Sequence, residues 1–164
     1  MEAELIDIAL GPVSLTAPGP ATRLVRADHG YLWQWIGDGE EYFSLSVAVR
    51  GTRLGTIDGV RDHLDWEVRQ VEKSLTRPQS RAPSTRPVLV MVDGAASSAA
   101  ADVDGEIAGR AVHNRVVVTT DGEHMHVVRA LVPDHAAGRE LSETMTSTLE
   151  VLSWAMPDAE DRDR

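Results

Sequence analysis

Residues 112–132 read VHNRVVVTTDGEHMHVVRALV, which is the pattern of a β-hairpin. Two runs rich in β-branched residues flank Asp121-Gly122, a dipeptide that is typical of two-residue hairpin turns. Such a turn predicts four cross-strand pairs, Thr120 with Glu123, Val118 with Met125, Val116 with Val127, and Val112 with Leu131.

The two faces of this hairpin differ in character. Side chains alternate between the faces of a strand, so Val116, Val118, Met125 and Val127 share one face and are expected to be buried. A pair of Asn114 with Arg129 interrupts that apolar face. The other face is polar and is expected to be solvated; it carries His113, Arg115, Thr119, His124 and His126.

The clearest helix is predicted over residues 57–76. Its apolar residues recur at three- and four-residue steps and form one stripe: Ile57, Val60, Leu64, Val68, Val71 and Leu75. Arg77-Pro78 ends the helix, because the residue before a proline is disfavoured in helical conformation. The Pro-, Ser- and Arg-rich residues 77–87 are interpreted as a loop.

The remaining segments complete an α+β fold, an antiparallel β-sheet flanked by one long central helix and one C-terminal helix. Short strands are expected over 5–10, 13–16, 22–27, 31–36 and 42–49, with Pro-Gly breaks at residues 17–20. Val88–Val92 is continuously apolar and predicts a buried strand, whereas Asp102–Gly105 resembles a turn. The last helix is expected over 138–154. Residues 1–156 then form one domain, and the charged residues 157–164 a disordered tail.

Composition excludes several classes of protein. The chain has 164 residues, no cysteine and a formal net charge of -10, so it has neither disulfides nor cysteine-bound zinc. Its acidic charge disfavours nucleic-acid backbones and anionic lipid surfaces. The start Met1-Glu2-Ala3-Glu4 does not resemble a signal peptide, and a cytoplasmic protein is expected. Arginine far outnumbers lysine, which is typical of GC-rich coding and indicates a bacterial source.

The histidines do not form a convincing catalytic or metal-binding pattern. His124 and His126 lie two apart, and two ligands without a third predict no metal site. Asp-His occurs three times, at 28–29, 62–63 and 134–135, but adjacent side chains diverge and make poor dyads. Phosphate-loop, dinucleotide-binding and nucleophile-elbow motifs are absent from the sequence. No catalytic residue and no cofactor is predicted.

The tryptophans are the more informative residues. Trp33 and Trp35 share one strand face, where core packing is the first interpretation and a ligand pocket the second. Trp66 lies about 200° around the helix from Leu64, on the side expected to face water. Its neighbours there are Asp62, Arg69 and Lys73. Large aromatics on a wet face are typical of protein interfaces, so these four residues are the predicted partner-binding site.

The order of elements resembles the PsbP/Mog-like superfamily. The resemblance rests on Arg115–Gly122 leading into Val127–Pro133, on the closing helix with Met145, Leu149 and Leu152, and on an opening strand, Val13–Gly19, that ends in Pro-Gly. The family's tryptophan after that turn is replaced here by Pro20-Ala21. The resemblance implies a sheet flanked by helices and a binding protein, such as an adaptor or secretion chaperone, without a catalytic motif.

Two functions of different classes remain open. The first is a non-enzymatic, chaperone- or adaptor-like module that binds another protein or a copy of itself, with a homodimer as one form. The second is a small-molecule-binding protein or enzyme whose pocket lies between the sheet and the long helix.

Overall fold

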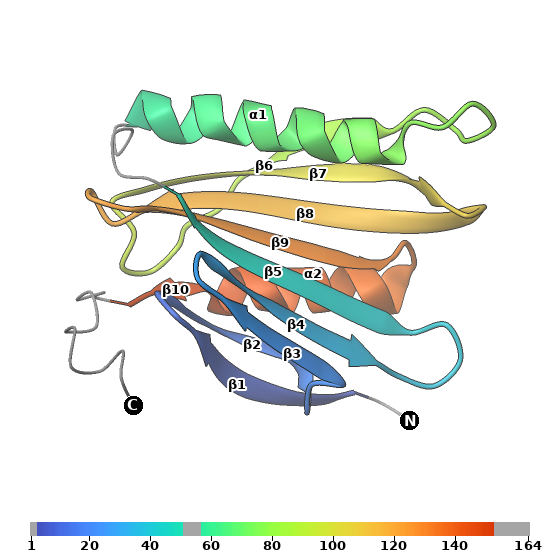
Figure 1. The fold of residues 1–164 in the computed structure, drawn as a ribbon, viewed down its shortest axis with the longest axis horizontal. Helices are drawn as coiled ribbons and strands as arrows, with labels where there is room; N and C mark the ends of the chain where they lie inside the picture. Colours follow the sequence, from blue (N-terminus) through green and yellow to red (C-terminus); the bar gives the residue numbers. More distant parts are fainter. Residues whose placement is uncertain (1–2, 51–56, 153–164) are drawn as a thin grey trace.

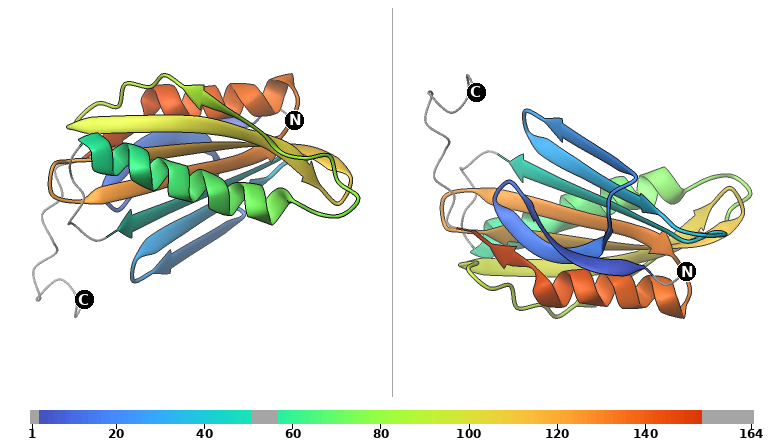
Figure 2. Two further views of the ribbon diagram at one scale, coloured as in Figure 1. Left: turned by 90° about the horizontal axis from the view of Figure 1, so that it is seen from above. Right: turned by 90° about the horizontal axis from the view of Figure 1, so that it is seen from below.

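A seven-stranded antiparallel sheet, in the order β3-β4-β5-β9-β8-β7-β6, is the centre of the computed structural model, which describes residues 3–50 and 57–152. A second sheet of three strands, β1-β2-β10, packs with α2 on one side of it (Figure 1). Helix α1 lies on the other side (Figure 2). The predicted α+β class, with antiparallel strands and two helices, is confirmed.

The elements follow one another along the chain with the following bounds: β1 Glu4–Leu10, β2 Val13–Gly19, β3 Arg23–Ala27, β4 Gly30–Ile36, β5 Tyr42–Arg50, α1 Ile57–Leu75, β6 Ser84–Val88, β7 Ser97–Ile107, β8 Arg110–Thr120, β9 Met125–Pro133, α2 Ala136–Thr148 and β10 Glu150–Val151.

Two apolar cores lie on the two sides of the large sheet. The first core, between this sheet and the layer of β1, β2 and α2, contains Phe43, Leu45, Val128 and Met145. The second core lies under α1, whose stripe from Val60 to Leu75 is buried as predicted. A sheet that is covered on both sides needs apolar residues on both faces of its central strands. The run Val116-Val117-Val118, which is fully buried, meets this need.

The β8–β9 hairpin has a longer turn than predicted. Thr120 pairs with Met125, and Val118 pairs with Val127, so the register differs from the expected one by two residues. The Asp121 carboxylate accepts hydrogen bonds from the backbone N–H groups of Glu123 and His124, at 2.8 and 2.6 Å, which stabilises a four-residue loop. A shift of two preserves the face of every side chain. The predicted burial of Val116, Val118, Met125 and Val127 is therefore confirmed.

The expected solvated face of this hairpin is wrong. His113, Arg115, Thr119 and His126 are buried, because the layer of β1, β2 and α2 covers this side of the sheet. The predicted Asn114–Arg129 pair is also wrong; Asn114 lies opposite Leu131, and Arg129 lies opposite Val116.

Two further segments of the sheet differ from the predictions. The strand predicted at Val88–Val92 is instead β6, Ser84–Val88, and only Val92 of the apolar run is buried. The predicted turn at Asp102–Gly105 is the middle of β7, where Asp102 and Asp104 lie opposite Arg115 and His113 of β8. These cross-strand partners outweigh the low strand propensity of aspartate.

Helix α2 ends at Thr148, six residues earlier than predicted. Leu149 adopts an extended conformation, and β10 then pairs with β2, which supplies backbone partners that a longer helix would forgo. Three features that the sequence predicted lie outside the described residues. They are the helix end at Trp154, the tail 157–164 and the place of the Ile57 side chain in the apolar stripe.

Candidate functional site

On the side of the large sheet where α1 lies, the helix covers only some of the strands. Among the described residues, α1 contacts β7 and β8, while β5, β4 and β3 extend the sheet beyond it (Figure 1). Eight of the side chains that the register places on this surface define what is here named the open face: Arg23, Val25, Leu32, Gln34, Ser44, Ser46, Arg129 and Leu131. All eight are exposed or half-buried. An antiparallel sheet can leave one face in water, so exposure alone does not assign a function.

The charge of this side of the sheet is distinctive. Arg23, Arg50, Arg110 and Arg129 all project from strands on the α1 side, where no residue of the described strands is aspartate or glutamate. The chain as a whole has a net charge of -10. Glu67 of α1 and Glu40 pair with three of these arginines, so the positive local field that could attract anionic groups is partly neutralised.

A buried glutamate of α1 joins the helix to this surface. Glu67 is 1% exposed, and its Oε1 accepts hydrogen bonds from Arg50 Nη2 at 3.0 Å and from His63 Nε2 at 3.2 Å. Arg129 Nη1 lies 3.8 Å from the other carboxylate oxygen. The glutamate thus fixes three side chains at the border between α1 and the open face.

Trp66 stands at the same border. Its ring stacks on His63 with centroids 5.7 Å apart and an interplanar angle of 29°. The side chain is 45% exposed, as predicted for this position. Its orientation depends on His63, which Glu67 holds in turn. Asp62, Arg69 and Lys73 are also exposed, as predicted, and lie on the same side of α1 as Trp66.

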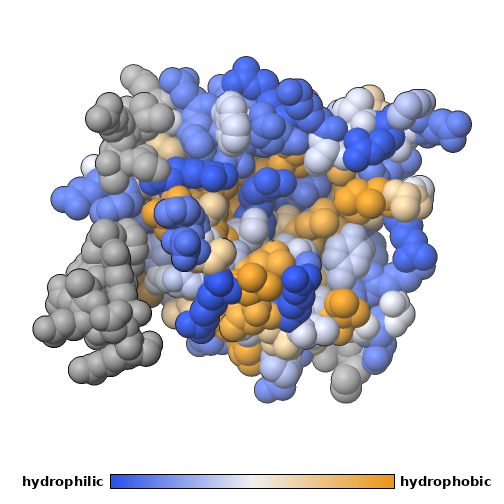
Figure 3. Space-filling model, viewed as in Figure 1, coloured by the Kyte–Doolittle hydropathy of each residue, from blue (hydrophilic) through white to orange (hydrophobic). Residues whose placement is uncertain are grey.

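Figure 3 shows the surface from the same side as Figure 1. The ridge of α1 is hydrophilic, and patches of hydrophobic surface lie below it. A cavity of about 390 Å³ occupies one end of the open face, lined by Gln34, Tyr42, Ser44, Arg110 and Leu131 among others. Arg110 forms an ion pair with Glu40 at 3.3 Å there. Burial raises the pKa of Tyr42 and the charge of Arg110 opposes this, so the phenol remains a protonated donor at neutral pH.

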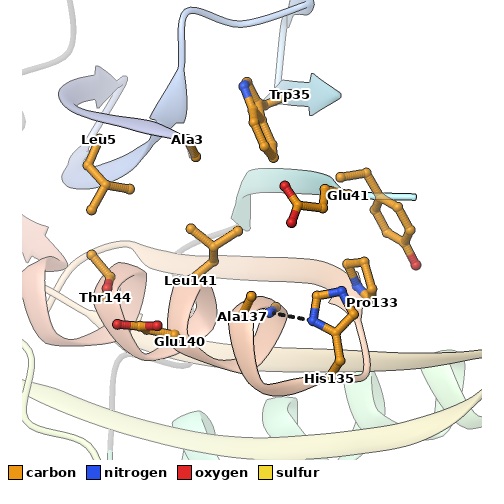
Figure 4. A pocket seen from close by; sticks show the side chains of 12 residues that line it. Ala3, Leu5, Trp35, Glu41, Pro133, His135, Ala137, Glu140, Leu141 and Thr144 are labelled. Carbon is orange, nitrogen blue, oxygen red and sulfur yellow. Dashed lines mark hydrogen bonds between the residues drawn. The ribbon is translucent and has the colours of Figure 1, made fainter. Parts of the chain in front are cut away.

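A second cavity, of about 300 Å³, lies on the opposite side of the sheet beside α2 (Figure 4). Trp35 and Leu141 contribute its apolar walls, and Glu41 and Glu140 its carboxylates. His135 caps α2 by accepting a hydrogen bond from the backbone N–H of Gly138 at 3.0 Å. No described side chain of α1 lines either of these two cavities, and the pocket expected between the sheet and the long helix stays a prediction.

Trp33 and Trp35 are mainly core residues, which agrees with the first interpretation of their strand. Trp33 is buried, and its indole N–H donates to the carbonyl of Pro18 at 3.0 Å. Trp35 is 9% exposed and lines both cavities, whereas Trp33 lines neither.

A buried ionic network connects β6, β7 and β8 to α2. Arg115 binds Asp102 through two hydrogen bonds, of 2.8 and 3.0 Å, and donates to Glu143 of α2 at 2.9 Å. His113 Nδ1 lies 2.6 Å from Asp104 Oδ1. Arg139 reaches Asp104 at 3.0 Å. These contacts hold α2 against the sheet and give the buried polar residues of β8 a structural role.

The histidine–carboxylate contact of 2.6 Å between His113 and Asp104 therefore joins two strands and does not come from an Asp-His dipeptide. In those dipeptides, His63 bonds to Glu67, Asp134 bonds to Arg139, and His135 caps α2. The pair of His113 and Asp104 could not be found from the sequence, because β7 was not recognised as a strand. His113 is 1% exposed, which leaves a substrate no access to its ring.

The pH dependence of stability is expected to include a contribution from His126. Burial lowers its pKa below the usual value of about 6.5, while Asp121 opposes and His124 adds to the effect. The unfolded chain then binds more protons than the fold, so stability is complete above pH ~6.5 and falls as the pH decreases toward the folded pKa. We expect His126→Leu to flatten the dependence of unfolding free energy on pH between about 7 and 5, measured by urea denaturation. An unchanged slope would contradict this assignment.

The described residues contain no group of three or more His, Asp or Glu side chains placed to hold a metal ion. The absence of a metal at His124 and His126 stays a prediction. Zinc titration by calorimetry is expected to show no tight one-to-one binding. Tight binding that is lost in His126→Ala would overturn it.

No family model and no curated protein matches the chain. Among solved structures, it is similar to a crystal structure from Bacteroides thetaiotaomicron, with 13% identity and a TM-score of 0.44. The match covers 85% of this chain and 45% of the other, so the chain spans less than half of that protein. This likeness carries no argument about family or function, and the PsbP/Mog-like resemblance stays a prediction. No helix in the described part of the chain is long and apolar enough to cross a membrane.

Proposed function

We propose that this protein is a non-enzymatic binding module whose open face and Trp66 take an acidic segment of a partner protein. The observation that carries the proposal is the set of four arginines, Arg23, Arg50, Arg110 and Arg129, on one side of a sheet in a chain of net charge -10. Guanidinium groups form strong, often bidentate hydrogen bonds with carboxylates.

Trp66 supports the proposal as an anchor that is positioned before binding. A tryptophan fixed by stacking loses less conformational entropy on association than a free one. Aromatic and arginine side chains are also the residues that most often dominate interface energy. A polypeptide fits better than a nucleic acid, because the acidic remainder of the surface repels a long polyanion but tolerates a short acidic segment.

A second candidate is the small-molecule binder. The cavity beside Trp35 and α2 favours it, since about 300 Å³ is at the lower end of ligand pockets. Its walls combine an indole with two carboxylates and would suit a small amine. The two functions are distinguished by the response to substitutions at Trp66 and Arg23, which lie outside that cavity.

Selection of random 12-residue peptides by phage display on the purified protein tests the proposal. We expect enrichment of peptides rich in Asp and Glu. Affinity of a selected synthetic peptide should fall at least about tenfold in Arg23→Glu. It should stay unchanged in Arg26→Glu, the matched control, because Arg26 projects from the opposite face of β3.

Three results would overturn the proposal. They are enrichment of peptides without acidic residues, an equal effect of Arg23→Glu and Arg26→Glu, and competition by a single-stranded oligonucleotide at the same salt concentration. The last result would assign the surface to nucleic acid.

Truncation of Trp66 is expected to separate binding from stability. Trp66→Ala should change the melting temperature by no more than a few degrees and weaken the selected peptide about thirtyfold, the loss typical of a hot-spot residue. A core tryptophan would cost roughly 3–5 kcal/mol of stability when truncated. Thermal melts and fluorescence anisotropy decide between the two outcomes, and a large loss of stability with intact peptide binding would contradict the role of Trp66.

A further inference from the structure

The cavity beside α2, here named the α2 cavity, lies where β1, the β4–β5 turn and the first turns of α2 meet. Its volume is about 300 Å³, which suits a small ligand. Its apolar walls are formed by Ala3, Leu5, Trp35, Pro133, Ala137 and Leu141. Walls of this kind bind the apolar part of a ligand, and the few polar groups among them decide which charge the ligand must carry.

Glu41 is the carboxylate that enters the α2 cavity. It ends the β4–β5 turn, where its N–H donates to the carbonyl of Asp38 at 3.4 Å and its carbonyl accepts from the N–H of Gly37 at 2.8 Å. The side chain is half-buried. Figure 4 shows the carboxylate pointing into the cavity, with the ring of Trp35 above it and His135 below. The turn therefore presents a fixed negative charge to a bound molecule.

The described residues give this charge no partner. No lysine or arginine lines the α2 cavity, and among the described residues Glu41 forms no ion pair and no side-chain hydrogen bond. His135 is not the counter-charge, because its Nδ1 accepts the N–H of Gly138 at 3.0 Å, and a nitrogen that accepts carries no proton. The preceding residue differs, since Glu40 pairs with Arg110 at 3.3 Å. A carboxylate that is partly removed from water without a counter-charge favours a cation from outside the chain.

Trp35 and the charge around the cavity favour the same kind of ligand. Trp35 is 9% exposed, so packing in the first core fixes its ring beside Glu41 before a ligand arrives. The face of an indole attracts a cation within about 6 Å of its centre. Glu140 is exposed and also lines the cavity; its carboxylate points away from Trp35 and adds to the negative field. This field repels an anion.

We infer that the α2 cavity binds a small organic amine in its ammonium form. The ammonium group lies between the Glu41 carboxylate and the Trp35 ring, and the apolar body of the ligand packs against Leu5 and Leu141. Alkyl amines are protonated at neutral pH, as the amine of lysine is. The inference gives the second candidate function its ligand class; it rests on that function and not on peptide binding at the open face.

Three probes of similar shape, n-hexylamine, hexan-1-ol and hexanoate, test which charge the cavity selects. NMR titrations of the full chain at pH 7 and constant ionic strength follow the indole N–H of Trp35 and the backbone N–H of Gly138, since both residues line the cavity. We expect hexylamine to shift both signals with a Kd at least about tenfold below that of hexanol, as for a hydrogen bond to a charged group. Hexanoate should bind more weakly than hexanol.

Two variants test whether Glu41 reads the charge. Glu41→Gln keeps the shape of the side chain and removes its charge, so hexylamine should bind about tenfold more weakly, while the Kd of hexanol should not change. Glu40→Gln is the matched control, because Glu40 belongs to the same turn but does not line the α2 cavity. It should leave the Kd of hexylamine unchanged.

Four results would overturn the inference. They are equal affinity for hexylamine and hexanol, tighter binding of hexanoate, equal losses in the two variants, and unchanged signals up to about 50 mM hexylamine, well above the Kd expected for a ligand of this size. None of them involves the selected peptide, so a failure of this inference and a failure of peptide binding at the open face are distinguishable.

Discussion

Replacing Arg115 with leucine is expected to lower the free energy of unfolding by about 3–5 kcal/mol, the range for breaking a buried ion pair by removing one partner. Arg115 and Asp102 are both nearly inaccessible, and the substitution leaves the aspartate charge buried without its bidentate partner. It also removes the hydrogen bonds from β8 to Thr146 and Glu143 of α2. Urea denaturation monitored by circular dichroism measures the loss.

Arg139→Leu is the matched control in the same network. Arg139 is partly exposed, and its carboxylate partners, Asp104 and Asp134, keep contact with water or with other cations. We expect this variant to lose no more than about 1 kcal/mol, as for exposed ion pairs. Equal losses in the two variants would contradict the distinction between the buried and the exposed part of the network.

The same network predicts how stability responds to acid. Burial alone would raise the pKa of Asp102, but the hydrogen bonds and charge of Arg115, with the charges of His113 and Arg86, outweigh it and hold the pKa below its usual value. The stabilisation from Asp102 is therefore complete above pH ~4 and is lost as the pH falls through the folded pKa. In Arg115→Leu this acid-labile contribution should disappear, which denaturation curves between pH 5 and 2 would show.

Replacing Phe43 with alanine is expected to cost about 3–5 kcal/mol, because the side chain is fully buried in the first core and leaves a large cavity. Ser44 and Ser46, on the same strand, belong to the open face. Replacing either serine with valine should change stability by less than about 0.5 kcal/mol, as for surface positions. Chemical denaturation of the three variants tests whether one side of β5 is core and the other bare. A loss above 1 kcal/mol in a serine variant would show that the open face is covered.

Local patterns were sufficient for the elements whose partners are close in the sequence. The stripe from Val60 to Leu75 predicted α1, and the alternation around Asp121-Gly122 predicted the inward face of the β8–β9 hairpin. Trp66 was correctly placed on the exposed side of its helix, because helical geometry fixes the angle between Leu64 and Trp66. These predictions needed only residues within one turn or one strand pair of each other.

The errors occurred where a distant segment supplied the environment. β7 was not predicted, because its aspartates pair with Arg115 and His113 on a neighbouring strand. The end of α2 was placed too late, because β10 pairs with β2, more than a hundred residues earlier in the chain. Propensity cannot anticipate such partners, and tertiary contacts then override it.

The sequence by itself determined the α+β class, the long amphipathic helix, the burial of one face of the central hairpin and the exposure of Trp66. Only the tertiary structure decided which polar residues are buried and which sheet surface is bare. Four arginines from β3, β5, β8 and β9 lie on one side of the sheet because strand order and register, and not chain order, set the face of each. The physical reason is that periodicity fixes where a side chain points, whereas the packing of remote elements fixes what it meets there.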